Sequence, residues 1–453
     1  MRPPRWRRSF EPLPREHGFE PLEVEGEFPA DLRGTLYRVG PGSFAAGGEP
    51  FGHWFDGDGA VSAVRLGVGT VEGACRFIEA RERAVEQRLG RRAFRGFGTG
   101  APHPAVTRVK QPVNVGALWW SGELYALGEG ISPHALDAAT LRTRGPSDLG
   151  GAVRSAFAAH PHRVATRRAA YNFGLRHGRR FEVDLLELPD GGPARRLCTV
   201  PLRSPRYLHD FAVTERRAVF VLPPLEADLD ALLDGTGPVA SAFRWQAGAA
   251  TEILTVELDP PHRATWSEAD PFFAWHLASA EELAGPGEGL QVELVRYPDF
   301  EINEWYGALP YREPAAAPAG TLARVYLSAA ARAKVEPFSD VSCELPVAAG
   351  EAIVAVARTA AADRGAPHDA VAVVDRERGE ARWFSSGPDH YPSGEPCIAG
   401  RYLLSLVYDA RAHRSGLVAF DLGEPGAGPV AAAWFDHHLP LAFHGTWVPA
   451  GER

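Results

Sequence analysis

Short apolar runs rich in β-branched residues alternate with polar turns along most of this chain. Residues 369–386 contain one such run, a polar turn at Arg376–Gly379 and a second run, and residues 401–423 repeat this design. The segments RRAVFVLPP and EAIVAVART are further runs of the same kind, bounded by charge or proline. Antiparallel hairpins have this pattern. It therefore predicts an all-β architecture, namely a sandwich, a barrel or a propeller.

Helical signals are confined to three short segments. Residues 225–235 have an acidic start and a glycine stop, residues 275–283 are long enough for two turns, and residues 78–89 have helical propensity. We find no repeat at a fixed period and no convincing linker. The chain, residues 1–453, is therefore predicted to form one domain, in which residues 1–28 are a partly ordered amino-terminal extension.

Composition narrows the class of protein. The chain is 45% hydrophobic and 23% charged, with a net charge of −9, so it has an ordinary soluble profile and lacks the basic excess of a nucleic-acid binder. Its four cysteines are scattered without a CxxC pair, which suits a reducing compartment and predicts no disulfide or zinc framework. No run of eighteen apolar residues predicts a membrane span, and no apolar segment follows the basic start. A cytoplasmic location is expected.

The sixteen histidines fall into contrasting settings. Several lie in charged or turn-rich segments and are predicted to be surface residues: His17, His134, His177, His262 and His413. Four others have aromatic or aliphatic neighbours within two or three positions: His160, His209, His276 and His444. Their wide separation is unlike a local metal motif such as HExxH. It is typical of ligands that come from separate strands and converge on one point.

The chemistry of such a site makes a second demand on the sequence. Neutral imidazoles suit iron, copper, zinc and nickel, and they leave the charge of the ion uncompensated. Carboxylates that accept the other ring N–H group usually offset that charge. Three acidic residues, Glu129, Glu344 and Glu395, lie in otherwise apolar segments. The alternative interpretation is that the histidines are hydrogen-bonded core residues and the glutamates are ordinary loop residues.

Several segments resemble the carotenoid cleavage oxygenases, in the order in which that family has them. These segments are LRGTLYRVGPGSF, GHWFDGDGAVSAVRL, NVGALWWSGELYALGEG, AHP, HDFAVTE, ELP, GEP and FHGTW. The resemblance extends from about residue 30 to residue 450. It implies a seven-bladed β-propeller in which long loops and a few short helices cap one face over an iron ion on the axis.

The resemblance also implies roles for the residues singled out above. The four histidines of the second group would be Fe(II) ligands, and the three glutamates would hold their ring N–H groups, although the pairing is open. No side chain beyond the metal centre is expected to act in catalysis, and no organic cofactor is expected. His444 lies close to the end of the chain because the last strand would return to the axis and close the ring.

This chain departs from the family pattern at a few positions. Ser279 and Glu281 replace an asparagine and an aromatic residue after the third histidine, and Ala442 replaces a glycine. His162 is a rival of His160 for the first ligand, and we favour His160. All four ligand types are retained, so these departures bear on the substrate rather than on the metal.

The expected reaction is cleavage of a C=C bond in an apolar conjugated substrate by O₂. In the stilbene-cleaving members of the family a lysine tends to precede the first glutamate, whereas this chain has Gly128 there and its nearest upstream lysine is Lys110. An unpaired phenolate in an apolar tunnel is costly, and glycine frees space for a long polyene. The sequence therefore favours an apocarotenoid or a carotenoid.

Other functions remain open from the sequence. Cleavage of phenolic stilbenes is the first alternative, followed by a non-cleaving isomerase and by a propeller scaffold that binds partners without iron. The sequence leaves open a weak peripheral contact with a membrane, where an apolar substrate would partition, but no amphipathic basic helix is visible. The sequence leaves the oligomeric state open. No nucleic-acid partner is expected.

Overall fold

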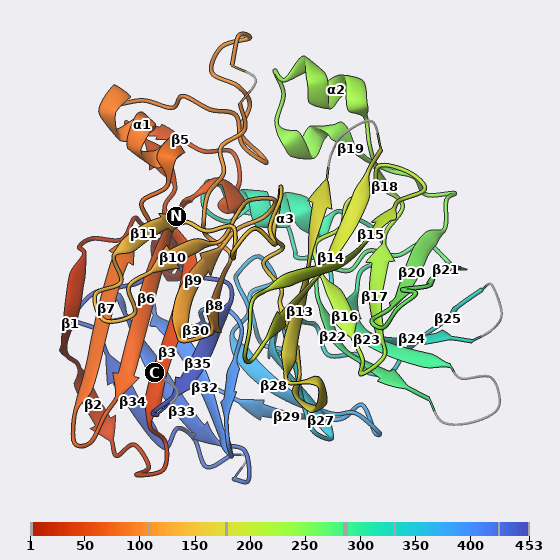
Figure 1. The fold of residues 1–453 in the computed structure, drawn as a ribbon. Helices are drawn as coiled ribbons and strands as arrows, with labels where there is room; N and C mark the ends of the chain where they lie inside the picture. Colours follow the sequence, from red (N-terminus) through yellow and green to blue (C-terminus); the bar gives the residue numbers. More distant parts are fainter. Residues whose placement is uncertain are drawn as a thin grey trace.

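Seven antiparallel sheets form the blades of a β-propeller (Figure 1). The computed structural model describes residues 3–106, 108–176, 180–283, 289–328, 332–424 and 426–451. Blade 1 mixes strands from both ends of the chain: β1 (His17–Pro21), β7 (Val71–Phe77), β6 (Asp58–Leu66), β3 (Gly34–Ser43) and β35 (Gly445–Pro449). Blade 7 does the same: β2 (Glu23–Gly26), β34 (Ala431–Trp434), β33 (Arg414–Asp421), β32 (Tyr402–Asp409), β30 (His390–Pro392) and β31 (Cys397–Ala399).

The five blades between them are each built from four strands in near-sequential order. Blade 2 contains β8 (Gly116–Trp120), β9 (Glu123–Leu127), β10 (His134–Leu136) and β11 (Thr143–Pro146). Blade 3 contains β12 (His162–Val164), β13 (Ala169–Arg176), β14 (Glu182–Pro189) and β15 (Arg195–Pro201). Blade 4 contains β16 (Phe211–Val213), β17 (Arg217–Leu222), β20 (Thr251–Glu257) and β21 (Ala264–Ala269). Blade 5 contains β22 (Leu277–Glu282), β23 (Leu290–Arg296), β24 (Thr321–Leu327) and β25 (Lys334–Pro337). Blade 6 contains β26 (Cys343–Ala349), β27 (Ala352–Ala357), β28 (Ala370–Asp375) and β29 (Ala381–Phe384).

Short helices and two small hairpins lie outside the blades. The helices are η1 (Arg5–Phe10), η2 (Trp54–Asp56), α1 (Arg81–Leu89), η3 (Ala165–Arg167), α2 (Leu229–Asp234), η4 (Val239–Ala242) and α3 (Ile302–Ala308). The hairpins are β4 (Ala45–Ala46) with β5 (Glu49–Pro50) and β18 (Leu225–Ala227) with β19 (Phe243–Trp245). Figure 1 shows α1 and α2 at the top, above the blades. Among the described residues, no helix has the length and apolar character needed to cross a membrane.

The ring of blades is closed by pairing between the two ends of the chain. The last strand, β35, pairs with β3, with Gly445 opposite Arg38 and Pro449 opposite Gly34. Near the other end, β2 pairs with β34 of blade 7, with Glu23 opposite Trp434. Both pairings are antiparallel and give hydrogen-bond partners to strands that would otherwise be free sheet edges. The expectation that the chain end closes the propeller is therefore met.

Two of the three expected helices form and the third does not. α1 ends at Gly90, which has φ +63°, and α2 begins after Asp228, whose side chain accepts the Ala231 N–H group. Residues 277–282 are instead the strand β22, which pairs antiparallel with β23 and has a register shift between Leu277 and Ser279. The helix prediction for residues 275–283 was wrong because backbone pairing within blade 5 overrides a weak local propensity.

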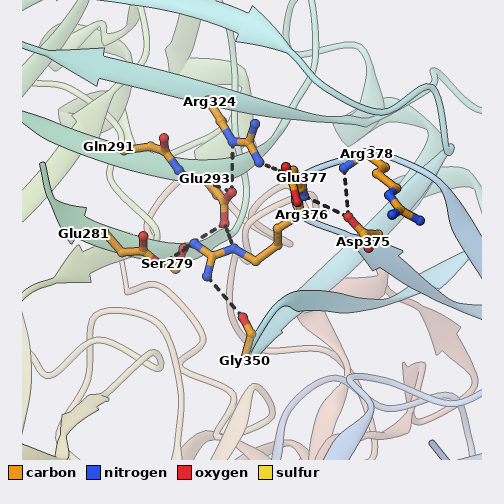
Figure 2. Close-up of polar contacts among 10 residues, drawn as sticks. All are labelled: Ser279, Glu281, Gln291, Glu293, Arg324, Gly350, Asp375, Arg376, Glu377 and Arg378. Carbon is orange, nitrogen blue, oxygen red and sulfur yellow. Dashed lines mark hydrogen bonds and ion pairs between the residues drawn. The ribbon is translucent and has the colours of Figure 1, made fainter. Parts of the chain in front are cut away.

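A buried ion network joins blades 5 and 6 (Figure 2). Glu293 on β23 is fully buried. Its carboxylate accepts hydrogen bonds from Arg324 Nε at 3.1 Å and from Arg376 Nε at 2.8 Å, and Arg376 directly follows β28. Ser279 on β22 donates to the same carboxylate at 3.0 Å, and Arg376 also pairs with Glu281. The two residues that depart from the family pattern, Ser279 and Glu281, thus anchor β22 to the neighbouring blade.

Candidate metal centre

The seven residues singled out from the sequence come from the seven blades, one from each. Each histidine lies one or two residues before the start of a strand. His160 precedes β12, His209 precedes β16, His276 precedes β22 and His444 precedes β35. Glu129 follows β9 of blade 2, Glu344 lies on β26 of blade 6 and Glu395 precedes β31 of blade 7. The propeller therefore brings together side chains that are far apart in sequence.

The four imidazoles converge on a common point. The Nε2 atom of His209 lies 2.9 Å from that of His160 and 3.4 Å from that of His276. His160, His276 and His444 each offer a ring nitrogen within 4.8 Å of the others. Two nitrogen ligands at right angles on an ion with bonds of about 2.1 Å stand roughly 3 Å apart. The described residues thus form a site with the dimensions and donors of a four-histidine metal centre.

Each of the three carboxylates lies beside the Nδ1 atom of a different histidine. Glu344 Oε2 is 2.5 Å from His276 Nδ1 in a hydrogen bond, and Glu395 Oε1 is 3.3 Å from His444 Nδ1. Glu129 Oε1 is 2.6 Å from His209 Nδ1, although the N–H group is not aligned on it as in a hydrogen bond. The pairing that the sequence left open is therefore given by the fold. These contacts leave the Nε2 atoms free to face the common point.

Burial and charge set the protonation of these groups. Burial holds the pKa of His160 and of His444 well below the usual histidine range, so both rings are neutral donors. His276 is equally buried, but the Glu344 carboxylate more than offsets this effect and raises its pKa. Burial raises the pKa of Glu395 to about 7. An ion of charge +2 at the centre would favour neutral rings and ionised carboxylates together.

His162, the rival of His160, lies outside the cluster. Its Nε2 atom is 2.9 Å from Oδ1 of the buried Asp210, whose other oxygen accepts the backbone N–H group of Leu277 at 2.7 Å. Burial opposes ionisation of Asp210, yet His160 and His162 hold its pKa below the usual range. Asp210 thus ties the segments of His209 and of His276 together. Sequence reasoning did not assign it a role, although it directly follows a candidate ligand.

Arg38 is a second residue that sequence reasoning missed. It is 1% exposed, and its guanidinium donates to the carbonyl oxygens of Phe443, at 2.9 Å, and of Glu395. Gly394 allows this approach, because it has φ +82° and an added Cβ would lie 2.2 Å from the Phe443 oxygen. Arg38 and Gly394 therefore position the pair of Glu395 and His444. The signal for Arg38 was its place in the recognisable segment LRGTLYRVGPGSF.

A cavity of about 300 Å³ opens onto the four-histidine cluster. Its walls are mainly apolar and include the rings of Phe55, Tyr207, Trp275, Tyr306 and Phe443. Several of these rings pack edge to face, for example Phe55 on Trp275 with centroids 5.5 Å apart. His209, His276 and His444 line the cavity, as do Glu129 and Glu344. The site therefore lies at an apolar, water-poor surface.

The lining contains two cationic side chains among the described residues, and both are already paired. Lys110 Nζ is 2.7 Å from Asp58 Oδ1 and 2.8 Å from Glu86 Oε2, and it is 3% exposed. Arg206 pairs with Glu226 at 3.3 Å and donates to the Pro223 carbonyl oxygen at 3.1 Å. Neither is available as the partner of a ligand anion without losing these contacts.

Gly128 differs from the sequence-based expectation. It is not among the cavity-lining residues, and an added Cβ would lie 2.5 Å from the Pro112 carbonyl oxygen and 2.9 Å from Ile131 Cδ1. The glycine is thus required by a close approach of the backbone and does not enlarge the cavity. The expectation that it frees space for a polyene was wrong, because that expectation ignored how tightly the segment before Glu129 packs.

Comparisons with known proteins agree with this fold and site. Residues 10–449 match the family described as retinal pigment epithelial membrane protein. The chain therefore belongs to this family, which is the family of the carotenoid oxygenases, and it is an oxygenase of that class.

Individual relatives cover between about three fifths and nearly all of the chain. It is 29% identical to the apocarotenoid-15,15'-oxygenase of Synechocystis sp., over 98% of this chain and 96% of that protein. It is 28% identical to resveratrol cleavage oxygenase 1 of Aspergillus fumigatus, over 62% of this chain and 56% of that protein. The crystal structure of cobalt-substituted Synechocystis ACO superposes with a TM-score of 0.89 at 27% identity, covering 98% of both chains.

Proposed function

We propose that this protein is a non-heme Fe(II) dioxygenase that cleaves a C=C bond of an apocarotenoid or a carotenoid with O₂, which gives two carbonyl products. The observation that carries this proposal is the convergence of four imidazoles, backed by three carboxylates, on the floor of an apolar cavity. Membership of the carotenoid oxygenase family supports it.

The four histidines fit Fe(II) by the chemistry of their donors. Neutral imidazole is a good ligand for iron, and His160, His209, His276 and His444 present ring nitrogens toward one point. When bound, Fe(II) with four protein ligands would supply open coordination positions for O₂. The carboxylates of Glu129, Glu344 and Glu395 would orient the rings and offset the charge of the ion.

The other residues around the cavity would bind and orient the substrate. The rings of Phe55, Trp275 and Phe443 offer flat apolar surfaces to a conjugated chain. Their packing also excludes water from the reacting carbons, which protects reactive species from side reactions. No proton transfer by an amino-acid side chain is required, because both oxygen atoms come from O₂ and remain in the two products.

The paired state of Lys110 and Arg206 bears on the substrate class. A phenolate needs a cation or hydrogen-bond donors when it is buried in an apolar cavity. Both cations of the lining are held by carboxylates of the protein, Lys110 by Asp58 and Glu86 and Arg206 by Glu226. An uncharged polyene requires no such partner. We therefore place apocarotenoids and carotenoids before the phenolic stilbenes on which a relative such as the resveratrol oxygenase acts.

Product analysis tests this assignment. Purified iron-loaded protein is incubated in air with a panel of apocarotenals, carotenoids and 4-hydroxystilbenes, and the carbonyl products are identified by mass spectrometry. We expect two aldehyde fragments from an apocarotenal and slower or no turnover of the stilbene when both compete. Faster turnover of the stilbene would overturn the substrate assignment and leave the metal site intact. A folded protein that binds no iron would overturn the enzyme assignment and indicate a binding scaffold.

A further inference from the structure

A second cluster of metal-ligating side chains lies away from the four histidines. His17, the first residue of β1, is directly opposite Cys75 of β7 in blade 1. His437, in the segment between β34 and β35, reaches the same point, and the three side chains each offer a ligand atom within 4.8 Å of the others. His17 was predicted to be a surface residue from its charged neighbours, but it is 8% exposed. None of the three lines the cavity.

The two imidazoles of this cluster face each other through their unprotonated nitrogens. His17 Nδ1 lies 2.8 Å from the Gly18 carbonyl oxygen and His437 Nδ1 lies 2.8 Å from the His438 carbonyl oxygen. A carbonyl accepts only, so both Nδ1 atoms carry the hydrogen and both Nε2 atoms of the neutral rings carry a lone pair. These Nε2 atoms are 3.0 Å apart. Two lone pairs at that distance repel each other unless a cation lies between them.

A shared proton is a poor answer to this repulsion. Both Nδ1 atoms already carry a hydrogen, so a proton between the rings would charge one of them, although His17 is only 8% exposed and the His437 side chain only 9%. The distance is also that of a metal site: two Nε2 atoms on a tetrahedral ion with bonds of about 2.05 Å stand roughly 3.3 Å apart. The corresponding separation between His160 and His209 in the candidate iron site is 2.9 Å.

Cys75 provides a donor that the iron site lacks. It is 1% exposed, and its thiol has a weak hydrogen bond to the Arg15 carbonyl oxygen at 3.4 Å. Burial raises the pKa of Cys75 to about 12, so without a cation the thiol keeps its proton. A bound divalent ion would displace that proton to solvent and compensate the thiolate charge. Asp436 Oδ1 lies 4.0 Å from His437 Nε2 and pairs with Arg15 at 2.8 Å, so this carboxylate would become the fourth ligand by exchanging Arg15 for the ion.

We propose that His17, Cys75 and His437 bind a structural divalent transition-metal ion, with Zn²⁺ as the best match and Asp436 or a water as the fourth ligand. Two imidazoles, one thiolate and one oxygen donor in a buried pocket are ligands that zinc accepts in tetrahedral geometry. No local motif indicates this site, because its residues are 58 and 362 positions apart along the chain. The pairing of β1 with β7 and the return of the chain end bring them together.

A neighbouring cluster shows by contrast why this one points to an ion. Glu11, His413 and His438 are also close to each other. There, however, His413 has Tyr408 Oη at 2.9 Å from Nδ1 and Glu11 Oε2 at 3.2 Å from Nε2, and His438 Nε2 is 3.2 Å from the Glu11 carbonyl oxygen. Hydrogen bonds within the protein satisfy those nitrogens. In the cluster of His17, Cys75 and His437, the facing Nε2 atoms have no such partner.

The position of the site suggests what the ion would do. It would link β1, near the amino terminus, to the segment that begins at Phe435. This segment leads to His444, which lies seven residues after His437. A structural ion adds its binding free energy to the stability of the folded state. We therefore expect the ion to stabilise the closure between blades 1 and 7 and to take no part in the reaction.

Cobalt spectroscopy distinguishes this site from the four-histidine site. The full chain is stripped of metal with a chelator and titrated with Co²⁺, and a thiolate-to-cobalt charge-transfer band is followed in the near ultraviolet. Only a site that contains cysteine gives this band, and the four-histidine cluster contains none. We expect two equivalents of tightly bound Co²⁺ and a charge-transfer band that develops fully with one of them.

Variants assign the band and test the role of the ion. Cys75→Ser and His437→Gln should each lose the band and one equivalent of Co²⁺ but should still bind iron. Zn²⁺ added to the iron-loaded variants, in which the four-histidine site is occupied, should no longer raise their Tm. Cys198→Ser, a partly buried cysteine outside the clusters, is the matched control and should retain the band. If wild type binds one equivalent without a charge-transfer band, the proposal is overturned. His437→Gln settles the result if Cys75→Ser does not fold.

Discussion

Glu344 Oε2 lies 2.5 Å from His276 Nδ1, and the other oxygen of the same carboxylate accepts the Tyr297 hydroxyl at 3.1 Å. His276 directly precedes β22 and Tyr297 directly follows β23, both strands of blade 5, whereas Glu344 belongs to blade 6. This contact therefore crosses the boundary between two blades at the axis. Glu344 is 1% exposed, and it has no solvent to compensate its charge. The orientation of His276 therefore depends on the packing of its neighbouring blade.

The first prediction concerns this carboxylate. Glu344→Gln keeps the shape of the side chain but removes its charge, so the Nδ1–H group of His276 loses its strongest acceptor. We expect the affinity for iron to fall about 10–100-fold with little change in secondary structure. A competition titration against a coloured iron chelator measures this. Glu336→Gln, a partly exposed position on β25, is the control. Wild-type affinity in Glu344→Gln would mean that the carboxylate is merely structural.

The second prediction concerns His444, the proposed iron ligand near the end of the chain. His444→Ala should lose bound iron and C=C cleavage together, because alanine offers no donor and the remaining three imidazoles form an incomplete site. Metal analysis of the purified variant measures the iron content. His134→Ala, which alters a partly buried histidine of blade 2, should bind iron as the wild type does. Full iron content in His444→Ala would remove the terminal segment from the metal centre.

The third prediction concerns the paired lysine in the cavity wall. Lys110→Met leaves the buried carboxylates of Asp58 and Glu86 without their shared cation. Breaking a buried pair by removing one partner typically costs about 3–5 kcal/mol of unfolding free energy. Urea denaturation should show a loss of this size, and the double variant Lys110→Met/Glu86→Gln should recover part of it. If Lys110→Met instead keeps its stability and selectively loses turnover of a hydroxystilbene, the lysine contacts substrate.

The fourth prediction is a dependence of stability on pH. His53 is fully enclosed under α3, where Asn303 accepts from its Nε2 atom at 3.0 Å, and burial lowers its pKa from 6.5 to about 4. Between these values the unfolded chain binds the proton and the folded chain does not. The contribution of His53 is therefore fully present above pH 6.5 and is lost as the pH falls toward 4. Its upper limit is about 3 kcal/mol.

Urea unfolding at pH 7 and at pH 4.5 tests the role of His53. His53→Gln retains a donor and an acceptor but cannot titrate, so its unfolding free energy should fall less between the two pH values than that of the wild type. Val61→Ala, a buried substitution in blade 1, lowers stability without changing a titrating group and should keep the slope of the wild type. Equal slopes in all three proteins would contradict the assignment to His53.

Local patterns predicted much of this fold because they depend on short-range physics. The hairpins at residues 369–386 and 401–423 form as expected, since alternating apolar runs and polar turns favour them in any context. The strand at residues 277–282 was missed because its own residues have a weak helical propensity, and its pairing with β23 overrides that propensity. His177 lies outside the described residues, so its predicted surface position stays a prediction.

The sequence by itself determined the kinds of side chain at the site and the order in which the family's segments carry them. It identified His160, His209, His276 and His444 by their apolar settings and their segments, and Glu129, Glu344 and Glu395 by the same logic. Only the tertiary structure decided which carboxylate supports which ring, that Lys110 is already paired, that Gly128 packs against backbone, and that His17 meets His437. The physical reason is that these contacts join different blades, so they depend on closure of the whole ring and leave no local pattern in the chain.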